Sequence, residues 1–144
     1  EDWDAHPELF DALVSTLAAL TDASEPLDII MRYQFALLHS IGSLPRFDSC
    51  VLCGREEDLT HFSSFEGGLI CRHCEPGHVE KREVAARTVE ALRGLAAPEA
   101  DRSESAGIPT GPFTVLNYHI AHLMGREPLL GTSLVPRSSQ RTAY

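Results

Sequence analysis

Four cysteines, arranged as two Cys-x-x-Cys pairs, constrain the fold of this 144-residue chain more than any other feature. Cys50 and Cys53 form the first pair, Cys71 and Cys74 form the second, and 17 residues lie between the pairs. Each short turn can aim two thiolates at one point, and the intervening stretch is long enough for a hairpin. This spacing is typical of a tetrahedral four-thiolate zinc site of the ribbon or knuckle type.

The other uses of paired cysteines are redox catalysis, a disulfide, or inert thiols. A thioredoxin-like redox site requires a strand before the motif and a helix that starts within it, and neither pattern is apparent at Cys50 or Cys71. Four thiolates already fill a zinc tetrahedron, so His61 and His73 are interpreted as surplus surface histidines. A closed site of this kind predicts one structural Zn²⁺, because catalytic zinc keeps a position open for water.

The remaining sequence favours a cytoplasmic, non-enzymatic protein. No stretch approaches the roughly 20 apolar residues of a membrane span, and no leader resembles a signal peptide. Paired cysteines in a reducing cytosol are more often metal ligands or redox catalysts than structural disulfides. No phosphate loop, nucleophile elbow or HExxH motif is present. Because the sequence starts at Glu1 rather than at a methionine, we expect a segment cut from a longer protein.

The charge argues against strong binding of nucleic acid by this segment alone. The chain carries 12 Lys and Arg against 21 Asp and Glu, a net charge of −9. Binding to DNA depends on neutralising phosphates with clustered cations. A role on DNA would therefore need a local basic patch or another domain.

Hydrophobic periodicity predicts four helices, at about 6–21, 26–41, 79–96 and 112–125. The second has an apolar surface wide enough to be buried on more than one side, and the third is expected to turn Val84, Thr88, Val89, Leu92 and Leu95 inward. Between them, at about 46–78, the helical period disappears, and the stretch around Glu66-Gly67-Gly68 is typical of a short hairpin. The predicted fold is mainly α: one helical domain over residues 1–144 with an inserted four-cysteine zinc ribbon or knuckle containing a β-hairpin.

Taken in order, four strings of the sequence resemble one family. They are HPELFDALVSTLAAL, FALLHSIGSLPRFDSCVLCG, FSSFEGGLICRHC and HLMGREPL. Together they resemble the C-terminal domain of the bacterial recombination mediator RecO, over essentially the whole chain. The most specific part is LLxxIGxxPxxxxCxxCG followed by GGxxCxxC.

The resemblance implies a function in DNA repair, recombination and the DNA damage response. Proteins of that family join an N-terminal OB-fold to a helical domain with a zinc finger, and they work with RecR to load RecA onto DNA coated by the single-strand binding protein SSB. The expectation is a bacterial cytoplasmic protein, associated with the nucleoid during repair. This segment would serve as a scaffold for protein interaction, while single-stranded DNA would be bound mainly by the OB-fold, which the chain lacks.

The resemblance also implies roles for particular residues. Cys50, Cys53, Cys71 and Cys74 match the zinc-binding positions of family members that have them. The helix with Arg32 and Tyr33 matches one that borders the pocket for the acidic, Phe-terminated SSB tail, and an arginine can hold a terminal carboxylate bidentately. The alternative interpretation of Arg32, as a plain surface arginine, stays open. The alternative for the whole chain is a zinc-ribbon adaptor or regulator unrelated to recombination, which would explain the cysteines but not the order of the flanking helices.

Overall fold

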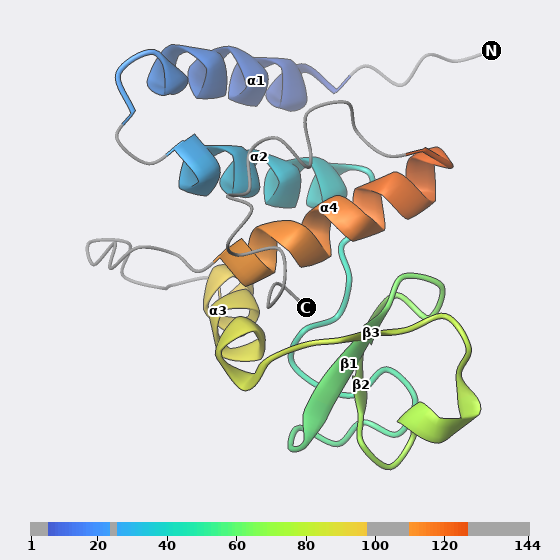
Figure 1. Cartoon of the computed structure of the whole chain (residues 1–144). Helices are drawn as coiled ribbons and strands as arrows, with labels where there is room; N and C mark the ends of the chain where they lie inside the picture. Colours follow the sequence, from blue (N-terminus) through green and yellow to red (C-terminus); the bar gives the residue numbers. More distant parts are fainter. Residues whose placement is uncertain (1–5, 24–25, 98–109, 127–144) are drawn as a thin grey trace, which may run out of the picture. The chain divides into compact units, whose positions relative to one another are not determined.

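The computed structural model describes residues 6–23, 26–97 and 110–126. These residues contain four α-helices, a 3₁₀ turn and a three-stranded antiparallel sheet (Figure 1). The predicted fold class, mainly α with a cysteine-bearing hairpin, is confirmed. The chain divides into two compact units, unit 1 (residues 1–44) and unit 2 (residues 45–144). That residues 1–144 act as one domain stays a prediction.

Unit 1 contains α1 (Pro7–Leu20) and α2 (Pro26–Ser40), which pack on each other. Both lie within one residue of their predicted bounds, and each has proline in its first turn, where the missing N–H is not needed. Gly42 ends α2 with a φ of +69°, and the Ser43 N–H donates to the Leu38 carbonyl at 2.8 Å. The left-handed conformation of Gly42 turns the next N–H group back toward a carbonyl that the helix end leaves free.

Unit 2 contains the sheet, in which β1 (Leu59–Ser63) is central between β2 (Gly68–Cys71) and β3 (Arg82–Glu83). β1 and β2 form the predicted hairpin, with Phe62 opposite Leu69 and Ser63 opposite Gly68. Gly67 has a φ of +79°, a conformation that glycine adopts without steric cost. The turn is therefore placed by the two glycines that the sequence pattern had singled out.

The chain before the first cysteine pair lies directly against β2. The Arg46 N–H donates to the Gly67 carbonyl at 2.9 Å, and the Leu69 N–H donates to the Arg46 carbonyl at 3.0 Å. A Cβ at Gly68 would overlap the Arg46 carbonyl oxygen and the Val51 side chain. Glycine at 68 thus allows a backbone approach that no other residue would permit.

The third predicted helix starts later than expected. The pattern predicted a helix over 79–96, but α3 is Ala86–Ala96, and residues 82–83 form β3 instead. The Val84 N–H donates to the Thr60 carbonyl at 2.8 Å, and Glu83 lies opposite His61. Val84 is buried as predicted, but it lies between β3 and α3 and not in a helix. Pairing with β1, a partner distant in sequence, overrides the local helical period.

Helices α3 and α4 (Thr110–Met124) complete unit 2 and pack on each other. Thr88, Val89 and Leu92 of α3 are buried, as the periodicity predicted, whereas Leu95 is half-buried. A Cβ at Gly111 would overlap the Thr88 side chain. The start of α4 therefore approaches α3 closely because glycine leaves room for it.

Phe62 connects the sheet to α4. Its ring is fully buried, stacks on Phe47 at 6.3 Å between centroids, and meets the rings of Tyr118 and His119 edge-on at 6.3 and 5.8 Å. Aromatic pairs prefer such offset and edge-on geometries. The cysteine segment and the helices of unit 2 therefore share one core. Among the described residues, no helix is long and apolar enough to cross a membrane.

Candidate metal centre

The first cysteine pair lies on a tight loop. The Gly54 N–H donates to the Cys50 carbonyl at 2.9 Å, and the Cys50 N–H donates to the Arg55 carbonyl at 2.7 Å. Gly54 has a φ of +76°, so the chain reverses immediately after Cys53. The reversal folds the loop back on itself and brings both sulfurs of the pair together.

The second pair follows the end of β2. Cys71 is the last residue of that strand and lies opposite Leu59 of β1. The Cys74 N–H donates to the Cys71 carbonyl at 3.1 Å, and the 3₁₀ turn Glu75–Gly77 begins at the next residue. Both cysteine pairs therefore lie on knuckle-like turns, and neither has the helix that a thioredoxin-like redox site requires.

Backbone hydrogen bonds bring the two turns together across about 20 residues of sequence. The Val51 N–H donates to the Leu69 carbonyl at 3.0 Å. The Cys71 N–H donates to the Cys50 sulfur at 3.4 Å. The sheet thus holds one turn against the other, as the hairpin prediction required.

The four cysteine sulfurs form a compact cluster. All lie within 4.8 Å of one another, and those of Cys53 and Cys71 are 3.7 Å apart. A zinc ion with sulfurs at about 2.3 Å gives tetrahedron edges of about 3.8 Å. A disulfide would need about 2.05 Å, and all four cysteines are free thiols. The donor set and spacing therefore fit a four-coordinate metal ion.

The electrostatics of the cluster also suit a cation. Burial raises the pKa of the Cys50 thiol, but hydrogen bonds from the backbone N–H groups of Cys71, Cys53 and Leu52 outweigh it and lower that pKa to about 6. The Cys74 thiol, which hydrogen-bonds to the sulfurs of Cys53 and Cys71, has its pKa raised to about 12. A thiolate therefore forms readily at Cys50. At Cys74, the hydrogen bonds to the neighbouring sulfurs oppose ionisation of the thiol. A divalent cation removes that opposition.

The two nearby histidines are outside the cluster that the described residues form. The Nδ1 atom of His61 hydrogen-bonds to Thr60 Oγ1 at 2.9 Å, and its Nε2 atom lies 3.9 Å from a carboxylate oxygen of Glu75. His73 is exposed. Both histidines therefore lie outside the four-cysteine cluster, but only His73 is a surface residue as expected, because His61 is half-buried.

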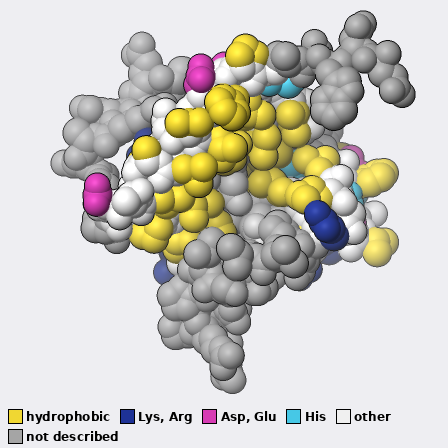
Figure 2. Space-filling model, turned by 90° about the horizontal axis from the view of Figure 1, so that it is seen from above, with side chains coloured by type: hydrophobic (Ala, Val, Ile, Leu, Met, Phe, Trp, Pro, Cys, Tyr) yellow, Lys and Arg dark blue, Asp and Glu magenta, His cyan; other side chains and the backbone are white. Residues whose placement is uncertain are grey.

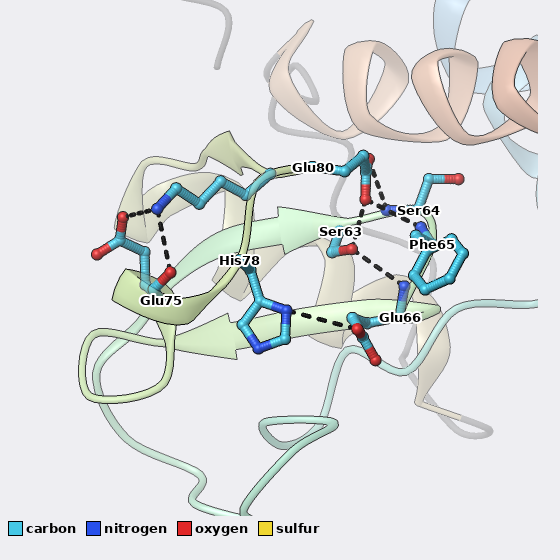
Figure 3. Close-up of polar contacts among 8 residues, drawn as sticks. Ser63, Ser64, Phe65, Glu66, Glu75, His78 and Glu80 are labelled. Atoms are coloured by element: carbon cyan, nitrogen blue, oxygen red, sulfur yellow. Dashed lines mark hydrogen bonds and ion pairs between the residues drawn. The ribbon is translucent and has the colours of Figure 1, made fainter.

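A carboxylate that the sequence did not single out fastens the hairpin to α4. Glu80 accepts hydrogen bonds from the Ser63 hydroxyl and from the backbone N–H groups of Ser64 and Phe65 at 3.1 and 3.0 Å (Figure 3). It also accepts one from the Tyr118 hydroxyl of α4. Burial raises the pKa of Glu80, but these bonds, led by that of Ser63, outweigh it and keep the pKa below its ordinary value. The carboxylate is therefore held ionised at the tip of the hairpin.

An arginine of α3 similarly fastens the first cysteine loop. The Arg93 guanidinium donates to the carbonyls of Phe47 at 3.3 Å and Asp48 at 2.8 Å, and to that of Glu56. These carbonyls lie on both sides of the first cysteine pair. Glu80 thus joins the turn of the hairpin to Tyr118 of α4, and Arg93 of α3 holds the backbone that flanks the first cysteine pair. No spacing motif marks either residue in the sequence.

Comparison with known proteins decides the family. The family described as Recombination protein O C terminal matches residues 1–129. The chain belongs to the RecO family. It is 36% identical over 136 residues to the DNA repair protein RecO of Anaeromyxobacter dehalogenans, covering 88% of this chain and 52% of that protein. The RecO of Myxococcus xanthus is 35% identical over 133 residues with the same coverage, and that of Bacillus cytotoxicus is 40% identical over 76 residues.

The chain spans about half the length of the first two RecO relatives, and no solved structure matches it. The resemblance carried by the cysteine strings and flanking helices is therefore confirmed as family membership. The function of a whole RecO protein belongs to a chain about twice as long as this one.

The residues expected to hold the SSB tail are in unit 1, on α2. Arg32 donates from its Nε atom to Asp28, one turn earlier, at 2.9 Å. Tyr33 is half-buried. The guanidinium is therefore already paired with a carboxylate, which a tail carboxylate would have to share or displace.

Proposed function

We propose that this chain is the interaction and scaffold part of a recombination mediator that helps RecR load RecA onto SSB-coated single-stranded DNA. The observation that carries the proposal is the RecO family match over residues 1–129, which extends well beyond the cysteine segment. A zinc-ribbon adaptor unrelated to recombination would share the cysteines but not the surrounding helices. The protein would act by binding other macromolecules in the bacterial cytoplasm, near the nucleoid during repair, and not as an enzyme.

Within this proposal, Cys50, Cys53, Cys71 and Cys74 hold one structural Zn²⁺. The spacing of the sulfurs and the all-thiolate donor set support the assignment, because soft thiolates in a tetrahedron select zinc over harder cations. When bound, the ion would cross-link the two turns and add its binding energy to the folding of unit 2. Four protein ligands leave no position for a reacting water.

DNA would be engaged mainly through another part of the full-length protein. Unit 1 carries eight acidic side chains and one arginine, a net charge of −7, and unit 2 carries thirteen and eleven, a net charge of −2. Neither balance supplies the excess of cations that phosphate binding requires. The segment alone should therefore release single-stranded DNA at moderate salt.

The mediator function is tested with the full-length protein that carries this segment. RecA is added to single-stranded DNA already coated with SSB, and its DNA-dependent ATP hydrolysis is followed with and without RecR. The expected result is a shorter lag that requires both proteins, and little effect on DNA without SSB. An unchanged lag on SSB-coated DNA would overturn the proposal.

The SSB-tail site is tested separately through the Arg32–Asp28 pair. If Arg32 receives the tail carboxylate, Arg32→Ala weakens binding of a labelled acidic peptide ending in Phe several-fold. Asp28→Asn then strengthens binding, because it frees the guanidinium from its competing partner. Arg87→Ala, an exposed arginine of α3, is the matched control. Equal affinities for all four proteins would place the tail elsewhere.

A further inference from the structure

Sulfur is the element of this chain that reacts most readily with mild oxidants. Hydrophobic side chains gather on the face shown in Figure 2, but their carbon atoms do not react with peroxides. The sequence contains four cysteines and two methionines. The susceptibility of a sulfur to peroxide follows its thiolate character and its exposure. Because methionine has no thiolate form, the cysteine cluster of unit 2 is the place where a peroxide reacts first.

The four cysteines are not equally accessible. Cys50 and Cys71 are fully buried, Cys74 is half-buried and Cys53 is exposed. The two buried cysteines are held against each other inside unit 2, since the N–H of Cys71, the last residue of β2, donates to the Cys50 sulfur at 3.4 Å. Cys53 is therefore the cysteine that a small oxidant reaches most easily.

A second sulfur lies next to that of Cys53. The Cys53 and Cys71 sulfurs are 3.7 Å apart, although the two residues are 18 positions apart in sequence. A disulfide requires about 2.05 Å, so the two sulfurs have to close a gap of about 1.7 Å. An accessible cysteine beside a second cysteine is the arrangement in which thiols sense oxidants. A bond between these two sulfurs cross-links the two cysteine turns, whereas a bond within either Cys-x-x-Cys pair does not.

We propose that Cys53 is a site of reversible oxidation by hydrogen peroxide, and that Cys71 converts the oxidised Cys53 into a disulfide that replaces the metal as the link between the two turns. The proposal rests on the assignment of the cysteines as metal ligands in the proposed function. Zinc, when bound, keeps the four sulfurs as thiolates, the form that reacts with peroxides.

The reaction has two steps. In the first, the Cys53 thiolate attacks one oxygen of the peroxide, the O–O bond breaks and hydroxide leaves, so that Cys53 becomes a sulfenic acid. In the second, the Cys71 thiolate attacks the Cys53 sulfur, the S–O bond breaks and a second hydroxide leaves. Two electrons pass from the two sulfurs to the peroxide. Only Cys50 and Cys74 remain as ligands, which is too few to hold zinc.

Backbone contacts around the cluster keep the two turns in place for the reverse reaction. The Val51 N–H donates to the Leu69 carbonyl, and the backbone of Arg46 bonds to both Gly67 and Leu69. None of these bonds involves a sulfur. Together with the new disulfide, they hold the turns against each other after the metal has left. A reducing thiol then restores the four-thiolate site.

The test treats the zinc-loaded chain with increasing amounts of hydrogen peroxide. Released zinc is followed with a chromogenic chelator, and disulfides are mapped by mass spectrometry of unreduced peptides. One zinc ion should be released for each Cys53–Cys71 disulfide formed, and dithiothreitol with added zinc should reverse both changes. In a separate sample without peroxide, N-ethylmaleimide should modify Cys53 before the other three cysteines.

Cys71→Ser and Cys74→Ser form a matched pair, because each removes one ligand but only the first removes the sulfur that resolves Cys53. Dimedone, which traps sulfenic acids, should label Cys53 several-fold more in Cys71→Ser than in Cys74→Ser. The proposal is overturned if disulfides form only within the Cys-x-x-Cys pairs, if another cysteine reacts first, or if the two variants are labelled alike. A chain that takes up no zinc before peroxide is added would overturn the metal assignment, and this proposal with it.

Discussion

Replacing Glu80 by glutamine should loosen the cysteine hairpin although no cysteine is touched. The carboxylate accepts four hydrogen bonds, two at each oxygen. Glutamine turns one oxygen into an NH₂ group, so two donors would face another donor. The hydroxyls of Ser63 and Tyr118 can rotate to accept from it, but a backbone N–H cannot.

The expected cost follows from which donors lose their partner. The Phe65 backbone belongs to an exposed residue and can turn to water, whereas Ser64 is only 6% exposed. The glutamine amide would therefore turn its NH₂ group toward the Phe65 N–H and keep its oxygen on the Ser64 N–H. The loss of one acceptor, together with weaker bonds to a neutral amide, gives a cost of about 2 kcal/mol. For a unit of this size the melting temperature should fall by about 10 °C.

The assay is amide hydrogen exchange of the zinc-loaded protein. Peptides from β1 and β2 should exchange faster in Glu80→Gln, while peptides from α2 serve as an internal reference. Glu83→Gln, on an exposed neighbour in β3, is the matched control. If Glu80→Gln exchanges like the control, the carboxylate does not fasten the hairpin and the reasoning fails.

The contribution of Glu80 also has a defined pH dependence. Its pKa is lowered in the folded protein, so its stabilisation is present above the ordinary pKa of 4.5 and is lost as the pH falls through the folded value. The stability difference between parent and Glu80→Gln should therefore be constant near neutral pH and shrink below about pH 4. A difference that persisted unchanged in acid would contradict this origin.

Three further substitutions test the support of the metal centre, each by thermal unfolding and metal content. Cys50→Ser should release the metal and loosen the sheet, while amide hydrogen exchange in α1 and α2, measured in addition, changes little. Retention of one metal per chain would contradict the ligand assignment. Gly68→Ala should cost about 2 kcal/mol through the overlap with the facing backbone, whereas Gly77→Ala, with open space around it, should be nearly neutral. Arg93→Met should lower the free energy of unfolding by about 1 kcal/mol, because three carbonyls lose a charged donor. Arg87→Met, the control, should lower it less. Equal effects would show that Arg93 does not hold the first cysteine loop.

The helices and the clustering of the four cysteines could be predicted because their signals are local. The 3.6-residue period of α1 and α2 reflects which side chains meet a neighbouring helix, and proline and Gly42 mark helix ends chemically. The cysteine spacing constrains geometry in the same way, because two short turns joined by a Gly-Gly hairpin can bring four sulfurs together. These features require no knowledge of distant residues.

The support of the cluster could not be predicted because it depends on contacts between residues distant in sequence. Glu80 bonds to Ser63 and Tyr118, and Arg93 reaches Phe47, which is 46 residues away. The start of α3 was wrong for the same reason: residues 82–83 pair with β1, although their local pattern favours a helix.

The central claim is that four thiolates hold one zinc ion at the junction of the two cysteine turns. Its most direct test is X-ray absorption at the zinc edge, combined with elemental analysis of the purified protein. The account predicts about one zinc per chain with four sulfur neighbours at about 2.3 Å and no nitrogen or oxygen ligand. Absence of stoichiometric metal after expression in zinc-replete medium, or a first shell containing nitrogen or oxygen, would contradict it.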